Sequence, residues 1–135
     1  MLRPLALTLA LSLSPAFAED ISLPYELQSI IDEAESYCDG EFSMADGSVQ
    51  QTDLNGDGTL DWILDSGGFR CSTAATLYCG TQGCGIDTLI DGTLGALLLH
   101  DWGTVTEGGV TYLTAPNDAG ETVRFLWTGR EWALQ

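Results

Sequence analysis

Short apolar runs separated by turn dipeptides fill the chain after Gly40, and this pattern constrains the fold more than any other feature. The breaks fall at Asp57-Gly58, Gly67-Gly68, Asp91-Gly92, Gly108-Gly109, Asn117 to Gly120 and Thr128-Gly129. The strands expected around them cover 47–52, 60–65, 75–79, 86–90, 94–100, 103–106, 110–115, 121–127 and 130–134. Such close spacing favours antiparallel pairing of consecutive strands, which is a meander.

One helix is expected before the strands. Six residues fall on one face of a helix over 23–38: Leu23, Leu27, Ile30, Ile31, Ala34 and Cys38. We expect Ser22 to cap this helix, Pro24 to lie in its first turn and Asp39-Gly40 to end it. The predicted fold class is α+β, with an N-terminal amphipathic helix packed on a twisted antiparallel β-meander sheet or a small open barrel.

Residues 1–18 have the layout of a secretory signal peptide. Arg3 is the positive region, Leu5 to Leu13 is the apolar core, and Ala16-Phe17-Ala18 is the small-x-small cleavage site. The apolar run is too short to span a bilayer. The sequence therefore predicts a single mature domain over 19–135, in the periplasm or secreted.

Acidic residues greatly outnumber basic ones. The chain has 20 Asp and Glu against four basic residues, all arginine, for a net charge of −16. Phosphate contacts need a basic face, so nucleic acid is excluded as a partner, and an anionic membrane surface is disfavoured. Two interpretations of the acidity remain: solubility in a saline medium, or attraction of divalent ions or a cationic protein.

Four cysteines in an exported domain predict two disulfides. The spacing of Cys79 and Cys84 suits a bridge across a glycine-rich turn, which leaves Cys38 to pair with Cys71. Three pairings remain open from the sequence alone. A zinc site is the alternative, but paired C-x-x-C knuckles are absent.

The segment from Asp53 to Asp61 carries oxygen donors at regular intervals. Asp53, Asn55, Asp57 and Asp61 occupy positions 1, 3, 5 and 9 of an EF-hand-type loop, and Thr59 at position 7 would give its backbone carbonyl. Gly58 stands at position 6, where such a loop turns sharply. We therefore predict one weakly bound Ca²⁺ at these five residues. An Asp-Gly turn without a metal is the alternative.

The loop departs from the EF-hand at position 12, where Leu64 replaces the bidentate glutamate. Asp65, one residue later, is a candidate for the missing carboxylate. The flanks read as strands rather than helices, so the loop resembles the calcium loops between strands in integrin-type and FG-GAP-type repeats. Only one copy is present, so no propeller is implied.

A broader resemblance rests on the signal peptide, the loop, Cys71 and the segment Tyr78 to Cys84. Together they resemble a group of small secreted proteins of alphaproteobacteria. The resemblance covers about residues 38–90 and the cysteine framework. It implies a periplasmic location and oxidised cysteines, and it brings no activity with it.

Residues suited to catalysis are scarce. His100 is the single histidine and follows an apolar run, which indicates a structural role near a turn. No G-x-S-x-G or Walker loop is present. A pair of carboxylates for glycoside hydrolysis is the one open catalytic route.

Four tryptophans complete the unusual features: Trp62, Trp102, Trp127 and Trp132. Packing in the core and across strands is preferred over a ligand-stacking platform, with Trp127 and Trp132 together across the last hairpin. We expect a non-enzymatic structural or binding domain. The alternative is a proteinaceous inhibitor of a cationic cell-wall hydrolase of the lysozyme type, a class that is similarly small, acidic and disulfide-bonded.

Overall fold

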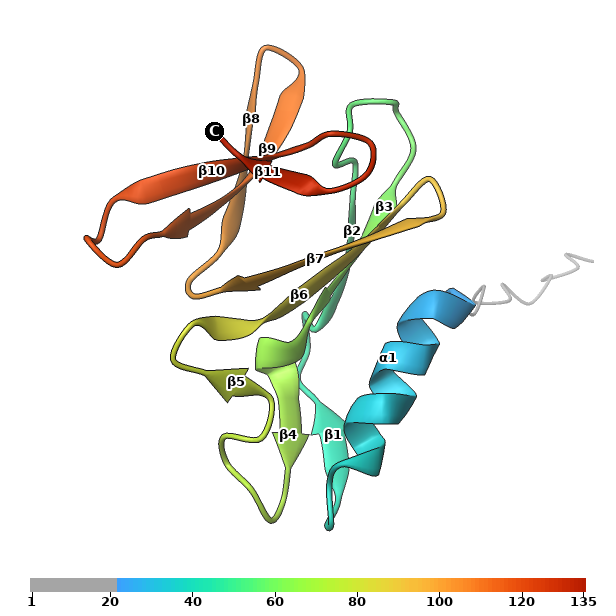
Figure 1. Ribbon diagram of the computed structural model, residues 1–135. Coiled ribbons are helices and arrows are strands. Elements are labelled where there is room, and N and C mark those ends of the chain that lie inside the picture. Colours follow the sequence, from blue (N-terminus) through green and yellow to red (C-terminus); the bar gives the residue numbers. More distant parts are fainter. Residues whose placement is uncertain (1–21) are drawn as a thin grey trace, which may run out of the picture.

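The computed structural model describes residues 22–135, and the expected signal peptide lies outside this range. Within it, one helix precedes a series of short strands (Figure 1). The elements are α1 (Tyr25–Ser36), β1 (Phe42–Met44), β2 (Val49–Thr52), β3 (Asp61–Asp65), a single 3₁₀ turn (Ser66–Gly68), β4 (Phe69–Cys71), β5 (Cys79–Gly80), β6 (Gly83–Ile90), β7 (Thr93–Leu99), β8 (Gly103–Glu107), β9 (Val110–Pro116), β10 (Thr122–Trp127) and β11 (Trp132–Leu134).

The strands of residues 22–135 form three antiparallel sheets, none of them closed into a barrel. β1 pairs with β4, and the last four strands form a meander in the order β11-β10-β9-β8. The central sheet has the order β2-β3-β6, with β7 also paired to β6 and β5 paired to the first residues of β6. The predicted α+β class, one helix on antiparallel sheets, is confirmed. The expected meander holds within the last four strands, whereas β3 pairs with the distant β6.

Alternating side chains of the central sheet build two separate cores. Ile63 belongs to the core shared with the four-stranded sheet, whereas its neighbour Leu64 belongs to the core under α1. Residues of β6 alternate in the same way, with Ile86 facing the second sheet and Leu89 facing the helix. The period of two along a strand therefore gives three layers: helix, central sheet and four-stranded sheet.

The helix buries the predicted face but is shorter at both ends. Leu27, Ile31 and Ala34 are buried. Ser22 does not cap the helix: the N-cap position is Pro24, which makes no side-chain cap hydrogen bond and has extended backbone. Its carbonyl accepts the N–H groups of Leu27 and Gln28, which completes the first turn.

Two features of the strand prediction are wrong. The run 75–79 is mostly turn, and only Cys79–Gly80 pairs with β6, because Tyr78 instead turns toward the helix, where its hydroxyl donates to the Ala34 carbonyl at 2.7 Å. Strands β1 and β4 were not expected. Three residues are too few to show a period of two, and their pairing joins distant segments of the chain.

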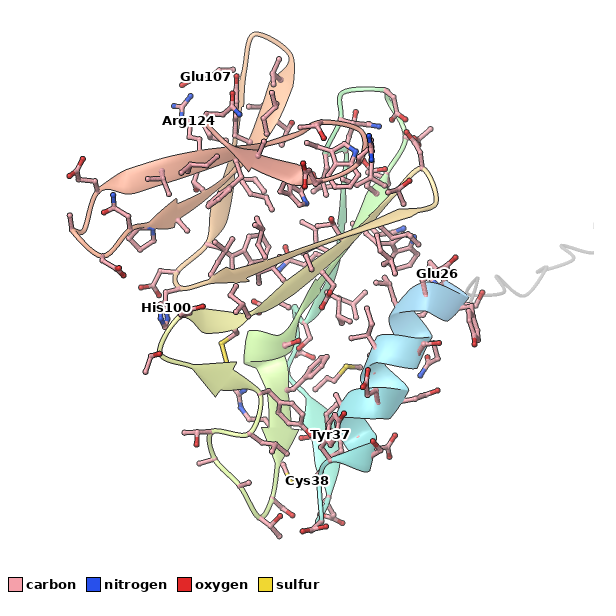
Figure 2. The ribbon with its side chains drawn as sticks, viewed as in Figure 1. Glu26, Tyr37, Cys38, His100, Glu107 and Arg124 are labelled. Carbon is pink, nitrogen blue, oxygen red and sulfur yellow. A yellow bond between two sulfur atoms is a disulfide. The ribbon has the colours of Figure 1, made fainter. Side chains whose placement is uncertain are left out.

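Both disulfides have the predicted pairing. Cys38–Cys71 ties the end of α1 to β4, and Cys79–Cys84 joins β5 to β6 (Figure 2). The zinc alternative is therefore wrong, and the two bridges indicate an oxidising compartment outside the cytoplasm. No helix within residues 22–135 has the length and apolar character needed to cross a membrane.

Candidate metal centre

The acidic loop connects β2 to β3 and is fixed at two points. Leu54 lies fully buried in the core between the central and four-stranded sheets. Asp61, the first residue of β3, is only 3 % exposed, and its Oδ2 accepts the Leu54 N–H at 2.8 Å. The loop is thus held on one side by an apolar anchor and on the other by a buried carboxylate.

Short side chains of the loop accept hydrogen bonds from other residues of the same loop. Asp53 accepts the N–H of Gly56 at 2.8 Å and that of Gly58 at 2.9 Å. Asp57 accepts both the N–H and the hydroxyl of Thr59, at 2.9 and 2.7 Å. Gly58 has a φ of +85°, which other residues rarely adopt, so the sharp turn predicted at this position is present.

Three carboxylates converge on one point. One oxygen from each of Asp53, Asp57 and Asp61 lies within 4.8 Å of the others. Oxygens bound to one calcium ion at 2.3–2.6 Å lie at most about 5 Å apart, so this spacing fits a shared ion. Within residues 22–135, no other group of three such side chains lies this close together.

The negative charges of the cluster repel one another. Burial raises the pKa of Asp61 most, and the negative charges of Asp57, Asp91 and Asp53 raise it further, while the Leu54 N–H lowers it. Hydrogen bonds from Thr59 lower the pKa of Asp57. A cation among these groups would relieve their mutual repulsion.

Asp91 is a neighbour of the loop that the sequence did not reveal. It lies in the turn between β6 and β7, and its Oδ2 accepts a hydrogen bond from Asn55 Nδ2 at 2.8 Å. Figure 1 shows this turn and the β2–β3 loop at the same end of the central sheet. In the sequence, Asp91-Gly92 signalled a turn, but nothing placed that turn beside the loop.

Asp65 does not supply the missing carboxylate, so that expectation is wrong. Its Oδ2 accepts the Trp102 Nε1–H at 2.9 Å, and its Oδ1 accepts the Gly67 N–H at 2.8 Å. Asp61 is the first and Asp65 the last residue of the five-residue strand β3, so the two carboxylates lie at opposite ends of it. Binding through Asn55 and through the Thr59 carbonyl stays a prediction.

The remaining candidates have structural partners. His100 is exposed (Figure 2). Its Nε2 lies 2.8 Å from the Thr81 carbonyl oxygen. Trp127 and Trp132 pack together with ring centroids 5.4 Å apart, as predicted. Trp132 is buried and donates to the Thr88 hydroxyl at 2.9 Å.

No protein-family model, curated protein or solved structure matches this chain. The kind of ligand that the chain binds must therefore be inferred mainly from the geometry of the acidic loop. Its converging donors are all oxygen atoms, and the single histidine and the disulfide-bonded cysteines lie outside the cluster. Such a donor set suits a hard cation that takes oxygen ligands.

Proposed function

We propose that this chain is a small, non-enzymatic domain of the periplasm or the secreted fraction that binds one Ca²⁺ ion. The ligands would be Asp53, Asn55, Asp57, the Thr59 carbonyl and Asp61. The observation that carries the proposal is the convergence of three carboxylates within 4.8 Å on a loop with calcium-type spacing. The two disulfides support a location outside the cytoplasm.

Calcium suits this loop better than magnesium. Mg²⁺ requires near-ideal octahedral geometry and keeps several waters, whereas Ca²⁺ accepts six to eight oxygens in irregular arrangements. Asp57 is exposed, so water has access to the ion and would complete its coordination. With no bidentate glutamate at position 12, we expect a dissociation constant of about 10⁻⁴ to 10⁻³ M, as in extracellular modules.

The proposed role of the ion is structural. The loop contacts the core through Leu54 and the β6–β7 turn through the hydrogen bond from Asn55 to Asp91. An ion at the cluster would therefore stiffen one end of the central sheet. At a calcium concentration ten times the dissociation constant, binding would add ~1.4 kcal/mol to the free energy of unfolding.

Calorimetry and thermal unfolding of residues 19–135 test this proposal. We expect heat on titration with CaCl₂ and a higher Tm in calcium than in EDTA. Asp57→Asn keeps the shape of the side chain and should abolish both signals. Asp118→Asn, an exposed change in the β9–β10 turn, removes the same charge and should leave them intact. Equal calcium effects in parent and Asp57→Asn would refute the site.

Export is the second part of the proposal. It is supported by the signal-type residues 1–18 and by the disulfides. Expression of the full chain in a bacterium, followed by cell fractionation and N-terminal sequencing, should recover a protein that begins at Glu19. A protein that stays in the cytoplasm with reduced cysteines would contradict it.

Inhibition of a cationic cell-wall hydrolase is the alternative function. Its support is electrostatic: within residues 22–135 the single ion pair joins Arg124 to Glu107, so most carboxylates have no cationic partner (Figure 2). A turbidity assay with lysozyme separates the two functions. Slower lysis in the presence of the purified domain, with or without calcium, would favour the inhibitor.

A further inference from the structure

Strand β7 leaves one edge of the central sheet open. It pairs with β6 and with no other strand of the described chain. The hairpin closes through Asp91 and Gly92, whose φ values are +48° and +77°. The residues that flank such a two-residue turn exchange both backbone hydrogen bonds, and the pattern then alternates. The N–H and C=O groups of Leu94, Ala96 and Leu98 therefore point away from β6, toward the open edge.

The side chains of these three residues form an exposed apolar stripe, which we call the β7 stripe. Leu94 is 44 % exposed and Leu98 is 58 % exposed, with Ala96 between them. Leu77, 41 % exposed, lies beside Leu98 in a shallow hollow of about 350 Å³. Edge strands usually carry a charge or a proline that blocks pairing, and β7 carries neither.

Three acidic residues lie close to strand β7, two in the segments that adjoin it and one on β6. Asp91 and Asp101 lie just beyond the two ends of the strand. Asp87 lies directly opposite Ala96 in the pairing of β6 with β7, so it is on the same face of the sheet as the stripe. Asp87 is half-buried, and burial raises its pKa, with no hydrogen bond or cation from residues 22–135 lowering it.

We propose that the β7 edge docks an extended, cationic segment of another protein, which adds a strand to the sheet and directs an arginine or lysine at Asp87. In strand addition, backbone hydrogen bonds supply affinity and alternate side chains supply specificity. A residue opposite Ala96 on the added strand would lie two strand spacings, about 10 Å, from Asp87. A long cationic side chain can cross that distance because only the methyl group of Ala96 lies between the added strand and Asp87. Apolar residues on either side would cover Leu94 and Leu98.

The charge of the protein favours a cationic partner over a second copy of this chain. Pairing β7 with β7 of another copy would bring Asp87, Asp91 and Asp101 near the same residues of that copy. Each chain also carries 20 acidic residues against four basic ones. Like charges at such an interface oppose association, whereas a cationic strand gains from every one of these carboxylates.

The proposal is tested with a short peptide of alternating valine and threonine that has one central arginine. A matched peptide carries N-methyl groups on the amides that would bond to β7, so it keeps the charge but cannot form the ladder. NMR titration of ¹⁵N-labelled protein should move the amide signals of Leu94, Ala96 and Leu98. The N-methyl peptide should bind at least tenfold more weakly. Equal binding of the two peptides, or no binding at millimolar peptide, would overturn the proposal.

Two variants locate the contacts. Asp87→Asn should weaken binding of the arginine peptide about tenfold, as expected for loss of a hydrogen bond to a charged group, and should leave a glutamine-centred peptide unaffected. Ala96→Pro removes an outward N–H while sparing the bonds to β6, and should abolish binding at an unchanged far-ultraviolet spectrum. Unchanged affinity in Asp87→Asn would refute the cation contact. A dimer of the protein alone that Ala96→Pro converts to monomer would show that the occupant is a second copy, which also overturns the proposal.

Discussion

Asn55 donates a hydrogen bond from Nδ2 to Oδ2 of Asp91 at 2.8 Å, across 36 positions of the sequence. This contact joins the acidic β2–β3 loop to the β6–β7 turn. It also places a fourth carboxylate near Asp53, Asp57 and Asp61, close enough to raise the pKa of Asp61. The two ends of the contact belong to neighbouring hairpins, so it links the candidate calcium loop to the strand pair that ends in β7.

Asp91→Asn should weaken calcium binding without unfolding the protein. Asparagine tolerates the left-handed backbone at this position, where φ is +48°, and it removes one negative charge. A charge close to the ion at the protein surface contributes about 1 kcal/mol, so the dissociation constant should rise roughly fivefold in calorimetry. Asp101→Asn, at a φ of +45°, is the matched control. Equal affinity of Asp91→Asn and the parent would show that Asp91 plays no part in binding.

Loss of the Cys38–Cys71 bridge should destabilise the protein more than loss of Cys79–Cys84. The first bridge spans 33 positions and the second spans five, and the entropy removed from the unfolded chain grows with the length of the loop. Paired serine substitutions should lower the free energy of unfolding by ~3 to 4 kcal/mol for the long bridge and by ~2 kcal/mol for the short one. Urea denaturation measures both values. The reverse order would contradict this explanation.

Asp87→Asn should stabilise the protein at neutral pH. Burial raises the pKa of Asp87 in the folded state above its ordinary value of 3.8. Below that value the carboxyl group is protonated in both the folded and the unfolded state, so it does not lower the free energy of unfolding. As the pH rises through the folded pKa, the folded protein must hold a partly desolvated charge, and stability is lost.

The gain in Asp87→Asn should therefore be present at pH 7 and disappear near pH 3.5. Urea denaturation at several pH values measures this dependence, with the exposed Asp46→Asn as the control. A stabilisation that persists unchanged at pH 3.5 would point to packing rather than to charge.

No catalytic activity is expected. His100 interacts with the Thr81 carbonyl oxygen, all four cysteines are in disulfides, and the chain has no lysine. A panel of glycan, peptide and phosphoester substrates in millimolar calcium should show no turnover. Turnover that vanishes when one Asp or Glu outside 53–65 is changed would prove this prediction wrong.

The local sequence pattern was sufficient to predict the helix, most of the strands and the acidic loop. The spacing of Leu27, Ile31 and Ala34 marked the buried face of α1, and the glycine-containing dipeptides marked most turns. The oxygen donors of the acidic loop could be identified from the sequence because they all lie in one short segment, at regular intervals. The local pattern did not predict β1 and β4, because each strand has only three residues. It also predicted a strand wrongly at Tyr78, where the side chain contacts the helix instead of pairing in a sheet.

The sequence by itself determined the α+β class, the buried face of α1, the formation of two disulfides and the spacing of the oxygen donors in the acidic loop. These features depend on periodicity, compartment and short chain segments. Only the tertiary structure decided that β3 pairs with β6, that Asp91 rather than Asp65 lies beside the loop, and that β7 is left as an open edge. The reason is physical: pairing between distant strands is selected by the fit of whole faces in the core, which no local pattern records.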